Sequence, residues 1–120
     1  MKIIEQGNTG YVYSGRFTGP VILEMLAEDV GRGATDVARV HFAEGAVTHW
    51  HSHPGGQLLL LVSGTGRVGA ESGAHPGLAP GVLVETPPGE RHWHGADAGT
   101  DAVWLAITWG VTDWEERSPL

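Results

Sequence analysis

Histidine side chains gather in two short stretches of this sequence. His49, His51 and His53 alternate in the first stretch, and His92 and His94 alternate in the second. On an extended strand, residues two positions apart project to the same face, with Cα atoms about 6.5 Å apart. Two imidazoles at that separation can reach one divalent ion, because nitrogen–metal distances are about 2.1 Å. The pattern therefore predicts a metal site built on strands.

A third donor follows the first histidine stretch. The run Pro54-Gly55-Gly56 predicts a turn, so Gln57 opens the returning strand close to His53. A further ligand, His92, must come from a distant strand. A lone His-x-His pair is weak evidence, but clustering buried imidazoles without an ion would be costly. The predicted ligands of one divalent transition metal are His51, His53, Gln57 and His92.

Three other histidines receive different interpretations. His94 has the parity of His92, and it is the candidate general base because imidazole titrates near neutral pH. The alternative is that His94 only makes a structural hydrogen bond. His49 has the parity of His51, and we expect it at the rim of the substrate pocket. His41 alternates with apolar neighbours, so it is predicted at the surface with no role.

Glycine and proline, 19 and 7 residues respectively, imply many turns between short segments. Many turns between short segments predict an all-β fold, either an antiparallel sandwich or a small barrel. One helical turn is the most that the tail allows, where Thr112 and Glu115 have capping-box spacing. The predicted strands are Gly10–Arg16, Val21–Met25, Thr35–Phe42, Val47–His53, Gln57–Ser63, Arg67–Glu71, Gly81–Thr86, Arg91–Gly95 and Ala102–Trp109.

Alternation within these strands predicts the walls of a pocket that suits a small molecule with one oxygen function. The wall residues are Ala38, Val40, Phe42, Trp104 and Thr108, with His49 at the rim. The run from Leu58 to Val62 is apolar on both faces, so something beyond the core must cover one of them. A homodimer or higher homo-oligomer is the simplest cover.

Composition limits the function classes. The chain has 120 residues, enough for one domain, with a core over 35–109, N-terminal strands over 1–34 and a tail over 110–120. Its formal charge is −7, which argues against a nucleic-acid partner. There is no cysteine, which excludes disulfides and thiolate ligands. We expect no membrane partner and a cytoplasmic location, because no apolar run approaches about 20 residues and no signal core precedes the strands.

Two spaced motifs resemble the cupin family. Gly45-x5-His51-x-His53-x3-Gln57-x6-Gly64 is similar to the first cupin motif, with Gln57 where the family usually has Glu. Gly81-x5-Pro87-x-Gly89-x2-His92 is similar to the second, although Ala96 replaces its usual closing Asn. The resemblance spans roughly 37–109. It implies one cupin domain over 1–120 with the double-stranded β-helix, or jelly-roll, fold and the four metal ligands named above.

A narrower resemblance is to small bacterial monocupins that include manganese-dependent hydroxynitrile lyases. It rests on His51-Ser52-His53-Pro54-x-Gly56-Gln57, on the run from Pro88 to Ala96, and on the tail Val111-Thr112-Asp113-Trp114. Glutamine is usual at position 57 in that group. Related sequences tend to have a histidine where this chain has Trp104, so any role of that histidine would be missing here.

The donor set shapes the expected chemistry. Three imidazoles and one amide carry no negative charge, so a divalent ion would keep its full charge and attract anions strongly. We therefore expect a redox-neutral lyase of hydroxynitrile lyase type, with the metal as Lewis acid and His94 as base. Manganese is the first expectation, with iron, nickel, cobalt and zinc as alternatives. The rival hypotheses are an oxygen-dependent dioxygenase and a metal-dependent module that binds a small ligand.

Overall fold

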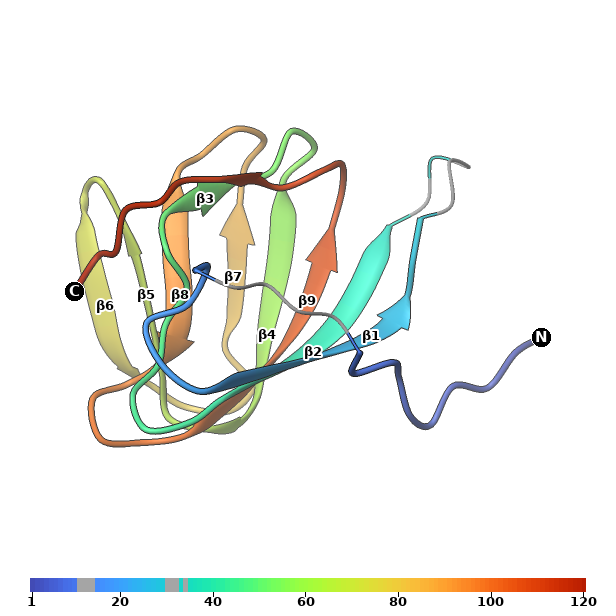
Figure 1. Cartoon of the computed structure of the whole chain (residues 1–120), viewed down its shortest axis with the longest axis horizontal. Helices are drawn as coiled ribbons and strands as arrows, with labels where there is room; N and C mark the ends of the chain where they lie inside the picture. Colours follow the sequence, from blue (N-terminus) through green and yellow to red (C-terminus); the bar gives the residue numbers. More distant parts are fainter. Residues whose placement is uncertain (11–14, 30–32, 34) are drawn as a thin grey trace.

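Two five-stranded antiparallel sheets form the protein, as a computed structural model describes it for residues 1–10, 15–29, 33 and 35–120 (Figure 1). One sheet has the order β1-β2-β9-β4-β7, and the other has the order β10-β3-β8-β5-β6. The strands are β1 Val21–Ala27, β2 Asp36–Phe42, β3 His51–Ser52, β4 Gln57–Gly64, β5 Gly66–Ala70, β6 Gly73–Leu78, β7 Leu83–Thr86, β8 His92–Ala96, β9 Ala102–Thr108 and β10 Asp113–Trp114. The expected all-β jelly-roll fold is confirmed.

The core lies between the two sheets, where every second residue of β2, β4 and β9 is buried. This period of two matches the alternation in the sequence, because successive side chains of a strand point to opposite faces. Trp104 is the largest fully buried side chain. The other buried hydrophobic residues of this cluster include Ala38, Val40, Phe42, Leu59, Leu61, Ala102 and Ala106.

Most predicted strands form, with small shifts at their ends. The predicted strand Val47–His53 is instead two isolated bridges at Val47 and Thr48, a bend at Trp50, and the short strand β3. The predicted strand Gly10–Arg16 falls mainly on residues outside the described part of the chain. Strand β6 was not predicted, because Pro76 and two glycines lie inside it. Proline is tolerated there because β6 is an edge strand of its sheet.

The tail forms no helical turn, although its capping-box spacing allowed one. Asp113 and Trp114 form β10 instead, paired antiparallel with Ser52 and His51 of β3. Without β10, strand β3 would be an open edge of its sheet, and its unpaired backbone groups can pair with the tail. In addition, the hydroxyl of Thr112 contacts His53 rather than capping a helix. None of the described residues belongs to a helix that could cross a membrane.

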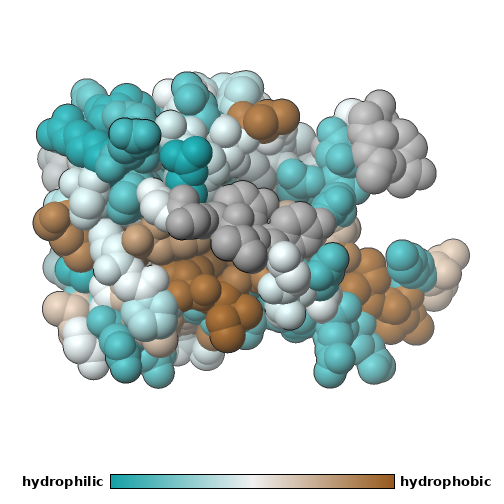
Figure 2. Space-filling view, viewed as in Figure 1, coloured by the Kyte–Doolittle hydropathy of each residue, from teal (hydrophilic) through white to brown (hydrophobic). Residues whose placement is uncertain are grey.

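Several large hydrophobic side chains remain exposed. One group, Ile3 and Ile4, lies in the N-terminal segment, at the right of Figure 2. A second group lies on the side of the five-stranded sheet β1-β2-β9-β4-β7 that faces away from the core. We call this side the outer face. Its positions on β4 and β9 are the exposed Leu60 and Val62 and the half-buried Leu58, Val103, Leu105 and Ile107.

A cluster of charged groups ties the N-terminal segment to β1 and β2. The carboxylate of Glu24 accepts hydrogen bonds from Arg39 at 3.0 Å and from the Gly7 amide at 2.8 Å. His41 Nε2 lies 3.2 Å from the same carboxylate. Arg39 also donates to the carbonyl of Glu5. The hydrogen bonds from Arg39, from the Gly7 amide and from His41 lower the pKa of Glu24 to about 2.

Glu24→Gln should destabilise the protein in a pH-dependent way. The carboxylate has a lower pKa in the folded chain than its ordinary value of 4.5, so its contribution is present above that value. The contribution is lost as the pH falls toward about 2. We therefore expect the difference in free energy of unfolding between wild type and variant to be largest near neutral pH and to shrink in acid. Urea unfolding measured from pH 7 to pH 2.5 tests this. A difference that stays constant across the series contradicts it.

Candidate metal centre

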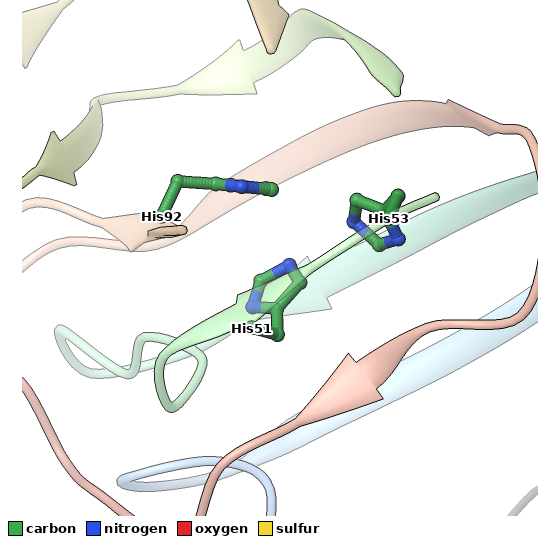
Figure 3. A group of neighbouring side chains, drawn as sticks. All are labelled: His51, His53 and His92. Atoms are coloured by element: carbon green, nitrogen blue, oxygen red, sulfur yellow. The ribbon is translucent and has the colours of Figure 1, made fainter. Parts of the chain in front are cut away.

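Three histidine side chains meet between the ends of two strands and a loop. His51 lies on β3 and is the direct cross-strand partner of His92 on β8, and His53 follows β3 by one residue. Their ligand atoms all lie within 4.8 Å of one another. The ring centroids of His51 and His92 are 4.3 Å apart, and those of His51 and His53 are 4.9 Å apart. Figure 3 shows the three rings turned toward a common space.

The turn after His53 brings Gln57 to the same space. Gly56 has a positive φ of 86°, and its amide donates to the carbonyl of His53. A Cβ atom at Gly56 would lie 2.9 Å from the Thr86 carbonyl oxygen, so the turn requires glycine. Gln57 then starts β4 with its Oε1 atom 3.0 Å from His92 Nε2. All four residues predicted as ligands are therefore close together and buried.

Thr108 holds the amide of Gln57. The two residues are cross-strand neighbours on β9 and β4, and Gln57 Nε2 donates to Thr108 Oγ1 at 2.9 Å. With the amide nitrogen occupied in this way, the amide oxygen faces the histidines. Thr108 was predicted only as a wall of the pocket, so its contact with Gln57 is an additional finding.

Backbone carbonyls orient two of the histidines. His51 Nδ1 lies 2.9 Å from the carbonyl of His49, and His92 Nδ1 lies 3.0 Å from the carbonyl of Glu90. A carbonyl only accepts, so each Nδ1 carries the proton and each Nε2 keeps a lone pair. This places two acceptors, His92 Nε2 and Gln57 Oε1, opposite one another.

Two observations test whether the residues fit a metal ion. His53 Nε2 is buried and has no hydrogen-bond partner among the residues that the structure describes. The facing acceptors His92 Nε2 and Gln57 Oε1 also lack a hydrogen between them. Buried polar atoms without partners are costly, and a cation would satisfy all of these lone pairs together. The donor set of nitrogen and one oxygen therefore fits a divalent transition metal.

Burial keeps these imidazoles neutral. It is the largest cause that lowers the pKa of His51, His53, His92 and His94, and for His53 the value falls to about 4. The neighbouring histidines add to the effect at His51, His53 and His94, because two positive charges at such short range repel one another. Neutral imidazole is the form that binds a metal, so the site is prepared for an ion at neutral pH. The expectation that His94 titrates near neutral pH is wrong, because burial lowers its pKa well below the ordinary value of 6.5; His94 is therefore neutral and can accept a proton.

A cavity of about 360 Å³ opens beside the candidate ligands. His51, His53, Gln57 and His94 lie in its wall. Ala38, Val40 and Thr108 also line it, at the positions predicted for pocket walls. The rest of the lining is largely apolar and includes Phe17, Leu23, Met25, Val111 and Trp114. The cavity can therefore hold an aromatic or aliphatic group against a polar floor.

Two predicted wall residues lie behind His94 instead. The ring of Phe42 is 5.5 Å from that of His94, and the ring of Trp104 is 6.2 Å away, both edge to face. Trp104 is fully buried, and its Nε1 donates to the Gly95 carbonyl at 2.9 Å. The Nδ1 atom of His94 has no hydrogen-bond partner in the described part of the chain. Phe42 and Trp104 thus support His94 without lining the cavity.

The structure does not bring His49 to this cavity. His49 lines a different hollow, together with Thr18, Glu44 and Ser118. The parity rule that placed it beside His51 fails because the chain bends at Trp50 between the two histidines. Two residues of the site were not predicted at all. Thr48 Oγ1 lies 3.2 Å from the His94 amide and 3.3 Å from His51 Nδ1, and Thr112 Oγ1 lies 3.0 Å from His53 Nδ1.

Comparisons with known proteins agree with this architecture. Residues 38–108 match the Cupin domain family. The chain is 42% identical over 91 residues to an (R)-mandelonitrile lyase from Granulicella tundricola, covering 76% of this chain and 70% of that protein.

Solved structures resemble the whole chain. A cupin-like protein from Thermotoga maritima has a TM-score of 0.83 and 39% identity, covering 98% of this chain and 90% of its own. A cupin 2 conserved barrel domain protein from Rhodopseudomonas palustris has a TM-score of 0.68 at 18% identity, covering 93% of this chain and 83% of its own. The second likeness concerns the fold alone.

Gln57→Glu should tighten the binding of a divalent ion. A carboxylate adds a negative charge to a neutral donor set, and Thr108 can then donate its hydroxyl proton to it. We expect the affinity for Mn²⁺ to rise by roughly tenfold or more, since unit charges about 4 Å apart interact by about 4 kcal/mol at an effective dielectric constant near 20, before desolvation. Competition titration with a metal-binding dye measures this. An affinity equal to that of the wild type, or weaker, would show that Gln57 is not a ligand.

Proposed function

This chain belongs to the cupin family, and from that premise we propose that it is a metal-dependent lyase acting on cyanohydrins. In this reaction a cyanohydrin is cleaved into an aldehyde and hydrogen cyanide, and the reverse reaction joins them. The observation that carries the proposal is the placement of His94. It lines the same cavity as three of the candidate ligands, and its buried Nδ1 lacks a partner among the described residues. The mandelonitrile lyase relative adds support at the level of sequence.

The residues of the site divide the work. His51, His53, Gln57 and His92 would hold one divalent ion, with manganese as the first choice and iron, nickel, cobalt or zinc as alternatives. When bound, such an ion supplies Lewis-acid stabilisation of a developing anion. His94 accepts the hydroxyl proton of the cyanohydrin while the carbon–cyanide bond breaks and cyanide leaves with the electron pair. The same imidazolium then returns the proton to cyanide, so that the enzyme ends as it began.

The apolar wall of the cavity explains the choice of substrate class. Phe17, Leu23 and Met25 offer apolar contacts to an aryl or alkyl group of the substrate. The neutral donor set also favours this redox-neutral reaction over oxygen activation, because oxidation would add charge that no carboxylate ligand balances.

His94→Ala should abolish most of the activity. We expect the rate of mandelonitrile cleavage by the Mn²⁺-loaded protein to fall by at least about 100-fold, which is typical when a general base is removed. The measurement is benzaldehyde absorbance, corrected for the reaction in buffer with Mn²⁺ alone. Metal content, determined on the same samples, should be unchanged. A variant as fast as the wild type rules out His94 as the base, and a wild type no faster than buffer rules out this reaction. Oxygen uptake by an iron-loaded sample is the outcome that would favour a dioxygenase.

We also propose that the protein is a homodimer that buries the outer face. The exposed fractions there are 37% for Leu60, 48% for Val62 and 61% for Leu83. The outward positions of β4 and β9 carry no charged side chain, whereas the chain as a whole has a charge of −7. At one flank, Arg39 and Glu24 already pair with each other at 3.0 Å. At the other flank, the exposed carboxylate of Glu85 on β7 lies beside Leu58. Two copies can therefore meet over β4 and β9, where the outward side chains add no like-charge repulsion.

Leu60→Lys should separate the subunits. In a symmetric contact, a lysine on this face would lose its hydration without gaining an ion-pair partner, which is costly. The equivalent lysine of the second copy would lie in the same contact and add like-charge repulsion. Light scattering coupled to size-exclusion chromatography should give the mass of two chains for the wild type and of one chain for Leu60→Lys. Val111→Lys, at another exposed hydrophobic position, is the control and should remain dimeric. A monomeric wild type overturns the proposal.

A further inference from the structure

We propose that the C-terminal segment 110–117 is part of the metal centre, because Thr112 positions the ligand His53. This inference rests on the metal site proposed above. It assigns to Thr112 the task of holding the Nδ1 proton of His53, so that the Nε2 lone pair faces the ion. The affinity for metal then depends on whether the C-terminal segment is docked.

The three histidines differ in what orients them. His51 and His92 each contact a carbonyl oxygen only two residues earlier in the chain. Those contacts are local, since each carbonyl lies just before the strand that carries the ligand. The partner of His53 Nδ1 is instead a side-chain hydroxyl, 59 residues away at Thr112 and 3.0 Å distant. The orientation of His53 is thus the one that a remote segment controls.

The tautomer of His53 depends on this contact. Neutral imidazole carries one proton, and the nitrogen without it is the one that can bind a metal. A hydroxyl can accept as well as donate, and we assign the Nδ1 proton of His53 to the contact with Thr112 Oγ1, because this leaves the partnerless Nε2 unprotonated and able to bind the ion. Without the hydroxyl, Nδ1 would lose its partner and the proton could move to Nε2, where it would block the ligand position.

Several contacts dock the segment beside the ligands. The ring of Trp114 lies against the ring of His51, with centroids 4.6 Å apart and planes 32° apart. Glu115 makes a double hydrogen bond with Arg91, at 2.6 Å and 2.9 Å. The Glu115 amide donates to the carbonyl of Trp50, and the Trp50 amide donates to the carbonyl of Arg117. In Figure 1 the red C-terminal trace accordingly runs alongside β3.

The segment lies outside the residues that match the Cupin domain family, because that match ends at residue 108. Gly110, Val111, Thr112 and Trp114 nevertheless line the cavity. Binding and docking must also be reciprocal, because a segment that strengthens metal binding is itself stabilised by the metal. Mn²⁺ should therefore slow hydrogen exchange at the Glu115 amide.

The test compares Thr112→Val with Thr112→Ser. Valine has nearly the same shape without the hydroxyl, whereas serine keeps it. Loss of a group that orients a metal-bound histidine typically lowers affinity by roughly 10–100-fold, and we expect that loss for Thr112→Val with Mn²⁺. Thr112→Ser should bind close to wild type. The electron paramagnetic resonance signal of free Mn²⁺, followed during titration, measures each affinity without relying on catalysis.

Thr100→Val provides the matched control. The Thr100 hydroxyl also donates part-buried hydrogen bonds, to the carbonyls of Thr65 and Asp97, but Thr100 lies in a loop away from the ligands. This variant should lose thermal stability without losing Mn²⁺ affinity. Circular dichroism and metal-free melting show whether each variant folds.

The outcomes separate this inference from the proposed reaction. Equal affinities of wild type and Thr112→Val, or equal losses in Thr112→Val and Thr112→Ser, overturn the role of Thr112. A wild type that binds none of Mn²⁺, Fe²⁺, Ni²⁺ or Zn²⁺ overturns the metal site as well. If the affinity falls as expected while no mandelonitrile is cleaved, the role of Thr112 stands and the lyase reaction fails.

Discussion

Buried lone pairs directed at one point are the constraint on which this structure depends. The carbonyls of His49 and Glu90 accept hydrogen bonds from the Nδ1 atoms of His51 and His92, so both rings present unprotonated Nε2 atoms to the centre. Leaving a buried polar group unpaired costs about 1–3 kcal/mol, and several such groups lie together here. A fold would not retain this arrangement for stability. The cost is understandable as preparation for an ion that all of these donors share.

The two sheets divide the task of assembling the donors. His51 and His92 are neighbours within one sheet, where antiparallel pairing places their rings side by side. Gln57 begins a strand of the other sheet, and its cross-strand partner Thr108 turns the amide oxygen inward. The site therefore spans the gap between the sheets, next to the cavity. It depends on both registers, since a shift of one residue would turn either set of side chains to the opposite face.

The chemistry follows from charge and polarity at this point. A donor set with no carboxylate leaves the charge of a divalent ion available to anionic groups, and the low-dielectric surroundings strengthen that attraction. His94 is held beside the donors by rigid aromatic neighbours, Phe42 and Trp104. The tail closes one side with Trp114 and Thr112, so the segment that walls the cavity also contacts a ligand.

The sequence by itself determined the features that depend on neighbouring residues. The alternation in β2 and β9, the turn at Gly56 and the shared face of His51 and His53 all follow from a period of two and from turn chemistry. His92 was predicted as a ligand from a distant strand, and the resemblance to known motifs agreed, but its place directly opposite His51 was not predicted. The rule that residues two positions apart share a face failed for His49, because the chain bends at Trp50, between His49 and His51.

Only the tertiary structure decided what the distant segments do. The tail has the spacing of a helix cap, but the open edge of β3 takes it as a strand. Gly73–Leu78 contains proline and glycine, and it forms a strand because its sheet offers an unpaired edge. The contacts of Thr108 with Gln57 and of Thr112 with His53 join residues 51 and 59 positions apart. Such contacts depend on register and closure of the sheets, which local patterns do not contain.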